Sequence, residues 1–142
     1  MRVRWFSFES EHAYLSGKCD RIDIDDNNNI SVIDYKTSKS SKSESELKKD
    51  IQMGIYALFT NLNGIRINKD IYIKEIPCKL TMLFLRNNNP EVSVGLSLND
   101  LKQIEDKIKI IAKRIKHSEY SGIKGKHCEW CDYRDLICPL FD

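Results

Sequence analysis

The chain has 142 residues, enough for one domain with a buried core but for little beyond it. Hydrophobic residues make up 41% and charged residues 31%, an ordinary balance for a globular protein. No stretch approaches the ~20 apolar residues of a membrane span, and the N-terminus lacks the apolar core of a secretion signal, so we expect a cytoplasmic (intracellular) protein that does not contact a membrane. A net charge of +2 excludes binding of nucleic acid through bulk charge alone.

The N-terminal third predicts strands. Residues 1–8 alternate and are rich in aromatic side chains, which favours a strand, and residues 20–37 predict a hairpin. Its turn would be residues 25–29, which are all aspartate or asparagine. Even-numbered positions of such a hairpin share one face. They are Asp20, Ile22, Ile24, Ile30, Val32, Asp34 and Lys36.

Two aspartates at the end of this face, away from the turn, suggest a divalent-metal site. A hairpin centred near Asn27 places Asp20 almost opposite Asp34, and directly opposed residues have Cβ atoms roughly 4.5 to 5.5 Å apart. Carboxylates that close repel each other unless a cation lies between them. Lys36, on the same face, can orient a water or stabilise charge on a phosphate. The alternative, which spacing alone favours, is an ion-pair cluster at the margin of a sheet.

A loop and a helix follow the hairpin. Residues 38–45 are serine, lysine and glutamate, which predicts a mobile loop beside the proposed site, where a substrate strand would pass. Residues 46–62 have apolar side chains at helical spacing, and the helix should end at residues 61–64. Gln52 and Tyr56 would lie on one side of it. Several lysines near the acidic pair can neutralise phosphates. They are Lys36, Lys39, Lys42, Lys48 and Lys49.

The second half predicts another hairpin and a long helix. Strands are expected over residues 79–86 and 92–96, joined by a turn with asparagine and proline. Residues 98–120 predict an amphipathic helix with the apolar stripe Leu101, Ile104, Ile108, Ile111 and Ile115. Its lysines form either a phosphate-neutralising cluster or a solvated face. Strands, helix, strands and helix together predict an α/β fold with a mixed central sheet flanked by helices, in one domain of residues 1–142.

Three of the five cysteines form a cluster near the C-terminus, Cys128-x2-Cys131-x6-Cys138. In an intracellular protein such a cluster binds metal more often than it forms disulfides. Its thiolates can face one metal, with His127 or a residue elsewhere as the fourth ligand. The alternative is three free thiols. The two remaining cysteines lie in strand patterns and are predicted to be core residues: Cys19 and Cys78.

Four motifs occur in a fixed order: Gly17-x-x-Asp20-Arg21-x-Asp23, Asp34-Tyr35-Lys36-Thr37, Gln52-x-x-x-Tyr56 and Cys128-x2-Cys131-x6-Cys138-Pro139. With these, the chain resembles the RecB-type branch of the PD-(D/E)xK nuclease superfamily from about residue 17 to 139. The resemblance implies a restriction-endonuclease-like core and a metal-dependent deoxyribonuclease. Such an enzyme would act like an exonuclease on DNA single strands or ends, in repair, recombination or defence against foreign DNA. The alternatives are a degenerate nuclease fold that binds DNA or protein without cleaving, and a small zinc-binding interaction domain.

The resemblance also implies roles for single residues. Asp20, Asp34 and the main-chain carbonyl of Tyr35 would bind Mg²⁺ or Mn²⁺, and Lys36 would position or help activate the attacking water. Four residues are expected to contact DNA, the first two also supporting the site: Gln52, Tyr56, Lys39 and Lys42.

The cysteines resemble the iron-sulfur staple of AddB-type helicase-nucleases and of CRISPR-associated RecB-like exonucleases. There four thiolates pin the C-terminal tail to the N-terminal region. Cys128, Cys131 and Cys138 would therefore hold a 4Fe-4S cluster, or alternatively Zn²⁺, in a tail of residues 121–142.

Two features of that family are not matched. The staple uses a further cysteine in an N-terminal helical region, which also carries a histidine or glutamate that completes the metal site. Only sixteen residues precede Gly17 here, and Glu9, Glu11 and His12 lie too close to Asp20, on an adjoining strand. We therefore expect a nuclease core without its N-terminal helices, which binds metal weakly, has an incomplete cluster, or needs another chain to supply the missing ligands.

Overall fold

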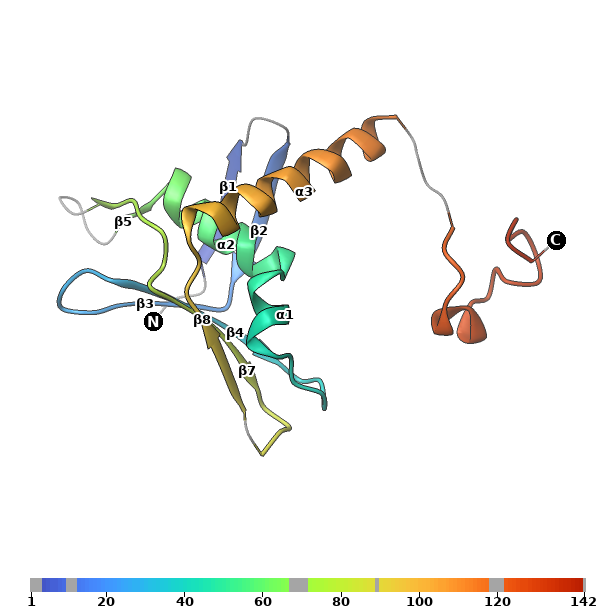
Figure 1. The fold of residues 1–142 in the computed structure, drawn as a ribbon, viewed down its shortest axis with the longest axis horizontal. Coiled ribbons are helices and arrows are strands. Elements are labelled where there is room, and N and C mark those ends of the chain that lie inside the picture. The colour runs from blue at the N-terminus through green and yellow to red at the C-terminus, as the bar shows by residue number, and fades with distance from the viewer. Residues whose placement is uncertain (1–3, 10–12, 67–71, 89, 118–121, 142) are drawn as a thin grey trace. The chain divides into compact units, whose positions relative to one another are not determined.

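The computed structural model describes residues 4–9, 13–66, 72–88, 90–117 and 122–141. It divides into two units, Met1–Lys109 and Ile110–Asp142, which are described separately. The helices and strands are labelled in Figure 1 and are, in chain order, β1 (Arg4–Glu9), β2 (Tyr14–Cys19), β3 (Arg21–Ile24), β4 (Ile30–Lys36), α1 (Glu44–Lys48), α2 (Ile51–Leu62), β5 (Ile65–Arg66), β6 (Tyr72–Ile73), β7 (Lys79–Phe84), β8 (Glu91–Val94), α3 (Leu98–Lys116) and the 3-10 helix η1 (Lys126–Trp130).

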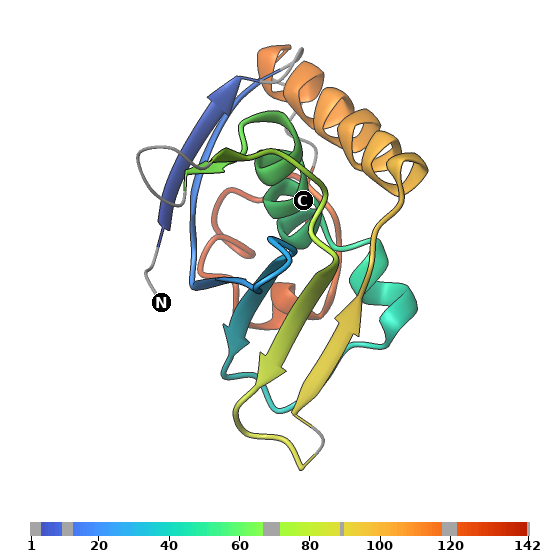
Figure 2. The same cartoon turned by 90° about the vertical axis from the view of Figure 1, so that its left-hand side faces the viewer.

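The central sheet of the first unit has four strands in the order β3-β4-β7-β8. β4 and β7 are parallel, whereas β3 pairs with β4 and β8 with β7 in antiparallel fashion. Figure 2 shows β4, β7 and β8 side by side. Parallel neighbours need a long crossover, and here α1, α2, β5 and β6 provide it. The predicted mixed sheet with flanking helices is confirmed.

The hairpin of β3 and β4 has the predicted register. Arg21 pairs with Ile33 and Ile24 with Ile30, so the hairpin is centred on Asn27. The Asp25 carboxylate closes the turn: Oδ1 accepts hydrogen bonds from the Asn27 and Asn29 N–H groups at 2.9 and 2.8 Å, and Oδ2 accepts one from the Asn29 side chain. Asn28 takes a left-handed conformation with φ 66°, which asparagine tolerates better than most residues.

One face of the sheet carries the core. In β4, Ile30, Val32 and Asp34 are buried while the residues between them are half-buried. The same face of β7 buries Leu80, Met82 and Phe84, and α1, α2 and α3 add the remaining apolar side chains. These are, from the helices, Leu47, Met53, Tyr56, Ala57, Leu58, Phe59, Leu101, Ile104 and Ile108. Asp34 thus lies on the apolar face, as the alternation predicts.

The predicted helix over residues 46–62 is wrong as a single element. α1 begins earlier, because Ser43 and Glu46 form a capping box: the Ser43 hydroxyl accepts the Glu46 N–H and the Glu46 carboxylate accepts the Ser43 N–H. The chain then breaks at Lys49 and Asp50, and α2 begins with Asp50 as its N-cap. The loop before α1 consequently ends at Ser43 instead of Ser45. α2 ends as predicted, followed by Gly64 with φ +70°.

Other boundaries and one core residue differ from the sequence predictions. β7 ends at Phe84 and β8 spans Glu91–Val94, so both strands stop two residues earlier than expected. α3 ends at Lys116, while Tyr120 lies outside the described residues. Cys78, predicted to be a core residue, is exposed, because it lies just before β7 begins. Its thiol donates a hydrogen bond to the Ile30 carbonyl at 3.2 Å. Cys19 is buried as predicted.

The contact between α2 and α3 depends on a glycine. A Cβ added at Gly54 would lie 2.6 to 2.8 Å from three side-chain carbons of Ile104, itself buried. Ile104 is β-branched and cannot swing away freely. We therefore expect Gly54→Ala to lower the free energy of unfolding by about 1–3 kcal/mol in urea titrations, although alanine is the better helix former.

Gly95→Ala is the matched control for that substitution. A Cβ at Gly95 meets only the Cys78 carbonyl oxygen at 3.5 Å, an ordinary contact. We expect its unfolding midpoint to stay close to that of the unmodified protein. Equal stability of the Gly54→Ala and Gly95→Ala variants would contradict the close packing of α2 on α3.

The second unit has little interior of its own. None of its described residues is fully buried, and Trp130, Tyr133, Leu136 and Ile137 are each more than 60% exposed. Two cations lie over the Phe141 ring in this unit, with Lys124 Nζ 4.5 Å and the Arg134 guanidinium 5.0 Å from the ring centre. Ile111 and Ile115, both predicted as part of the apolar stripe, are exposed. None of the described helices is long and apolar enough to cross a membrane.

Candidate active site

The two predicted aspartates both lie where the ladder between β3 and β4 ends. Arg21 and Ile33 are the last backbone pair of this ladder. The chain then bends at Asp20, and the Asp20 side chain, in place of its backbone, bonds to β4. Asp20 Oδ2 accepts a hydrogen bond from the Tyr35 N–H at 3.0 Å. Asp34 is the next residue of β4 and is 2% exposed. Asp20 was predicted as part of the strand, but it lies at the bend between β2 and β3, and its position near Asp34 is as expected.

Lys36 and Gln52 extend the acidic pair into a network. Lys36 Nζ lies 2.6 Å from Asp34 Oδ2 and donates to Gln52 Oε1 at 2.7 Å. The Gln52 amide in turn donates to Asp34 Oδ1 at 3.2 Å. Gln52 therefore holds both the lysine and the aspartate, and it does so from the first turn of α2. The Lys36 side chain is 29% exposed, so its ammonium group can reach a bound substrate.

Tyr56 supports this network from one helical turn below Gln52. Its hydroxyl accepts a hydrogen bond from the Gln52 amide at 2.8 Å. The hydroxyl proton is shared between the Lys18 carbonyl at 3.1 Å and Asp34 Oδ1 at 3.3 Å. Burial and the negative charge of Asp34 raise the pKa of Tyr56, so the phenol stays protonated and remains a donor. The predicted pairing of Gln52 and Tyr56 on one side of the helix is confirmed.

Cys19 reports on the electrostatics of the site. Burial, then the charges of Asp34 and Asp20, raise the pKa of its thiol to about 12. At neutral pH the thiol is protonated and uncharged, which makes Cys19 a packing residue and a poor metal ligand.

The donor set suits a hard divalent cation. Asp34 Oδ2 is buried and makes no hydrogen bond, although Lys36 Nζ lies close to it. Without metal, the Lys36 ammonium group offsets the cost of burying this oxygen, and a bound cation would have to share it with Lys36. Mg²⁺ is commonly held by one or two carboxylates together with water and substrate phosphates. In the parts of the chain that are described, no third His, Cys, Asp or Glu joins a metal-binding group, so these two aspartates would carry the binding.

Of the three residues predicted not to complete this metal site, Glu9 is described and is exposed on β1, where it pairs with Tyr14. The opposite end of β1 pairs with Cys19, next to Asp20. Five strand residues separate the two ends, roughly 17 Å at 3.4 Å per residue. Glu9 was predicted to lie too close to Asp20, but in the structure it lies too far along β1 to reach Asp20, so it still does not complete the site. Glu11 and His12 lie outside the described residues.

Arg21 and Asp23 belong to the first motif but point away from the acidic pair. The Arg21 guanidinium contacts Asp23 through Nε at 2.8 and 2.9 Å and through Nη2 at 2.5 Å. This pairing lowers the pKa of Asp23 below its ordinary value. The carboxylate is thus fully engaged on the opposite face of the hairpin.

The two lysines expected to contact DNA lie before α1 and differ in their surroundings. Lys39 is exposed in the loop. Lys42 forms an ion pair with Asp50, the N-cap of α2. Sequence reasoning did not identify Asp50, although an aspartate three residues before Met53, whose N–H it accepts at 3.0 Å, is a recognisable capping signal. The Lys18 carbonyl was also missed, because main-chain acceptors leave no trace in the sequence.

Asp50 should stabilise the start of the helix that presents Gln52. Burial alone would raise the pKa of Asp50, but Lys42 and the backbone N–H groups outweigh it, and the pKa is lowered. We expect Asp50→Ala to cost about 1 kcal/mol of unfolding free energy by loss of the cap. A lowered pKa contributes stability above the unfolded value of about 3.9, and this is lost as pH falls through the folded pKa.

Asp50→Asn separates the cap from the charge. Asparagine caps helices about as well as aspartate but forms no ion pair with Lys42. We therefore expect Asp50→Asn to keep most of the free energy of unfolding at pH 7 in urea titrations. The decrease in this free energy that protonation of Asp50 causes at acid pH should be absent from the variant. An Asp50→Ala variant as stable as the unmodified protein would contradict the role of the cap.

The C-terminal cysteines are described individually. Cys131 is exposed, and Cys128 and Cys138 are half-buried. Cys128 Sγ accepts the Gly125 N–H at 3.4 Å. These three thiols do not form a metal-binding group within the described segments. Their assignment as cluster ligands therefore stays a prediction.

Comparison with known proteins gives one family and two curated relatives. A family model described as the PD-(D/E)XK nuclease superfamily matches residues 1–139. Both relatives are named as subunits of an ATP-dependent helicase/deoxyribonuclease, from Limosilactobacillus reuteri strain DSM 20016 and L. reuteri subsp. reuteri strain JCM 1112. In each case 33% of 112 residues are identical, covering 71% of this chain. The chain spans about 8% of the length of these relatives.

Proposed function

Because the chain belongs to the PD-(D/E)XK nuclease superfamily, we propose that it hydrolyses phosphodiester bonds of DNA with Mg²⁺ or Mn²⁺. The RecB-like family and the restriction-endonuclease-like fold class expected from the motifs are shown by the match. The observation that carries the proposal is the network of Asp20, Asp34, Lys36 and Gln52 at the end of β4. Exonuclease-like action on single strands or ends, in repair, recombination or defence, is part of the proposal.

Each residue of the network has a distinct task in this proposal. Asp20 and Asp34 would hold the cation, with the Tyr35 carbonyl as the expected third ligand. A cation bound there supplies Lewis acidity at the scissile phosphate and lowers the pKa of a bound water. Lys36 orients the attacking water and stabilises negative charge on the phosphate. Gln52 fixes the Lys36 ammonium group and Asp34 in one geometry, and Tyr56 fixes Gln52.

The test is degradation of end-labelled single-stranded DNA by the purified chain. We expect products with Mg²⁺ or Mn²⁺ and none with EDTA. Cleavage that persists undiminished in both Asp34→Ala and Lys36→Ala would sink the proposal, because a contaminating nuclease would then be responsible.

A second candidate function is a non-catalytic DNA-binding or protein-interaction module. It is favoured by the presence of only two carboxylates at the site in the described part of the chain. DNA binding without cleavage under any divalent metal would support it. The relatives are subunits by name, so a partner chain that supplies the missing ligands is a further part of this candidate. Cleavage that appears only on adding such a partner would favour an incomplete enzyme.

We also propose that Cys128, Cys131 and Cys138 hold a 4Fe-4S cluster or, alternatively, Zn²⁺. The support is the lack of a fully buried residue in the described part of the second unit, since a segment this small needs a metal, a disulfide or a partner to hold its fold. The expected result is iron and sulfide in the anaerobically purified chain, lost in Cys131→Ser but kept in the control Cys78→Ser. Zinc without iron would select the alternative, and neither metal in the unmodified chain would contradict both.

A further inference from the structure

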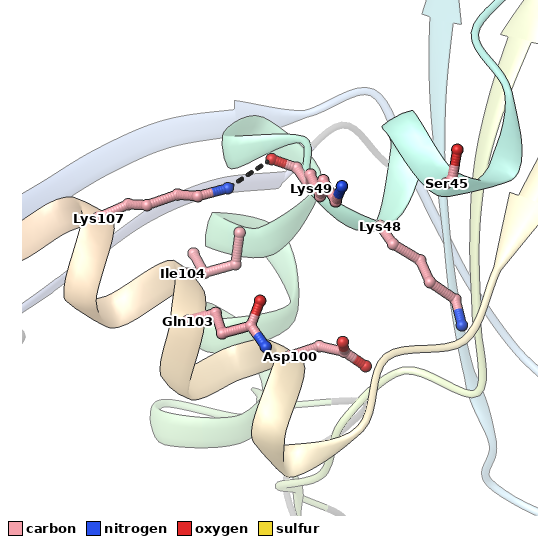
Figure 3. Close-up of a pocket in the computed structure, with 7 residues that line it drawn as sticks. All are labelled: Ser45, Lys48, Lys49, Asp100, Gln103, Ile104 and Lys107. Carbon is pink, nitrogen blue, oxygen red and sulfur yellow. Dashed lines mark hydrogen bonds between the residues drawn. The ribbon is translucent and has the colours of Figure 1, made fainter.

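A pocket of about 150 Å³ lies between the junction of α1 with α2 and the first turns of α3. It belongs to the first unit and is separate from the acidic network. Figure 3 shows the residues that line it: Ser45, Lys48, Lys49, Asp100, Gln103, Ile104 and Lys107. Three of these seven residues are lysines, and one is acidic.

The walls of the pocket are held in place by helix contacts. Lys107 Nζ donates a hydrogen bond to the Lys49 carbonyl at 3.2 Å, which links α3 to the end of α1 (Figure 3). Ile104 is buried against α2 and lies close to Gly54. Lys49 caps α1, its N–H bonded to the Glu46 and Leu47 carbonyls. The lysines therefore project from a backbone that is fixed on both sides.

The pocket has an excess of positive charge. No ion pair neutralises Lys48, Lys49 or Lys107 among the residues that the structure describes. Asp100 is the one carboxylate, and it accepts hydrogen bonds from the Ser97 N–H and hydroxyl at 2.8 and 2.7 Å. These bonds, and to a smaller extent the charge of Lys48, lower the pKa of Asp100, so Asp100 stays charged and offsets one of the three lysines.

We propose that this pocket binds a backbone phosphate of the DNA strand, away from the scissile bond. The inference rests on the proposed function, and it adds a binding site to it. Lysine ammonium groups are point-charge ligands for phosphate, and the Gln103 amide and the Ser45 hydroxyl add neutral donors. All five side chains that would donate are exposed, so a polymer can reach them without closure of the protein.

The position of the pocket along the chain links it to the acidic network. Lys49 precedes Gln52 by three residues, so their Cα atoms are at most about 11 Å apart. The proposed path of the strand runs from a phosphate at Lys36 to one at Lys49. Binding by charge alone is independent of base sequence, as degradation of varied DNA requires.

The test measures binding of a fluorescent single-stranded oligonucleotide in EDTA, so that cleavage does not interfere. The variant Lys48→Gln/Lys49→Gln removes two charges and leaves Lys107 to hold α3. We expect roughly tenfold weaker binding at ~100 mM salt, and a slope of log K against log salt reduced by about 0.7, since the pocket holds one phosphate and each single-strand phosphate contact contributes about 0.7. The matched control is Lys102→Gln/Lys113→Gln, which removes two exposed charges from α3 outside the pocket and should leave the slope unchanged.

An equal loss of affinity in both double variants would overturn the proposal, since it would reflect net charge and not the pocket. Inorganic phosphate, titrated while the Gln103 side-chain amide is followed by NMR, separates the sources of the anion. A shift with phosphate, combined with unchanged DNA binding by Lys48→Gln/Lys49→Gln, would also overturn it, because the pocket would then bind a free anion. Unfolding curves must show that each variant is folded.

The outcomes also separate this inference from the proposed function. Pocket-dependent binding without cleavage by the unmodified chain would sink the nuclease proposal and leave the phosphate pocket standing. Metal-dependent cleavage, together with DNA binding that does not depend on Lys48 and Lys49, would support the nuclease proposal and overturn the phosphate pocket.

Discussion

Lys36→Met should reduce the rate of DNA cleavage by roughly 10²–10³-fold, the usual cost of removing one group that stabilises developing charge. Among the described residues, the Lys36 ammonium group is the only cation that bonds to Asp34 and Gln52. No other cation of this network is therefore in place to replace it. Methionine keeps the unbranched length of the chain but donates no hydrogen bond. Single-turnover cleavage of labelled DNA at saturating enzyme measures this loss without a contribution from weaker substrate binding.

Metal binding should respond to Lys36→Met in the opposite direction. Lys36 Nζ lies 2.6 Å from Asp34 Oδ2, where it competes with any cation for that oxygen. Removing the ammonium group therefore leaves metal affinity equal or higher, and Mn²⁺ should raise the melting temperature at least as much as in the unmodified protein. Lys79→Met is the control, because Lys79 pairs with Glu91 on β7 and β8 and should be replaceable without loss of cleavage. Parallel loss of cleavage and of metal binding in Lys36→Met would contradict a role in chemistry.

The hairpin that carries the site was predictable because two independent signals agree on it. Alternation assigns the faces, and the asparagine-rich turn fixes the centre, which together place Asp20 beside Asp34. A slip of one residue would turn Ile30 and Val32 outwards, so the register is strongly determined. Cys19 was assigned to the core because it lies in a strand pattern, and it is buried.

Features that depend on local caps or on tertiary contacts were not predictable from apolar spacing. Leu47 and Ile51 continue one helical stripe, yet the Asp50 cap ends α1 and begins α2 between them. Gln52 could be placed on the same side as Tyr56, but its bond to Lys36 joins residues sixteen apart and follows only from packing of α2 on the sheet. Cys78 is followed by an apolar strand pattern, which suggested a core position. It is exposed because β7 begins only at the next residue, Lys79.

Asp34→Asn should abolish both metal binding and cleavage, with cleavage reduced by roughly 10³-fold or more because the loss of a ligand removes the Lewis acid as well. The substitution keeps the shape of the side chain, so the contacts of Oδ1 with Gln52 and Tyr56 can be retained. What it removes is the charge on Oδ2, the buried oxygen without a hydrogen bond. Lys36 then loses a buried ion-pair partner, so we expect the metal-free stability to fall, by up to about 3–5 kcal/mol, and the effect of metal is the difference with and without Mn²⁺.

Calorimetry and thermal unfolding with Mn²⁺ provide the measurement. In the unmodified protein, metal at a hundredfold excess over the dissociation constant stabilises by about 2.7 kcal/mol, and Asp34→Asn should show none of this gain. Asp23→Asn is the matched control: the same chemical change in the same hairpin, but on the opposite face and paired with Arg21. It should keep both metal binding and cleavage. Full metal stabilisation in Asp34→Asn would place the cation elsewhere and remove the basis for assigning Asp20 and Asp34 as its ligands.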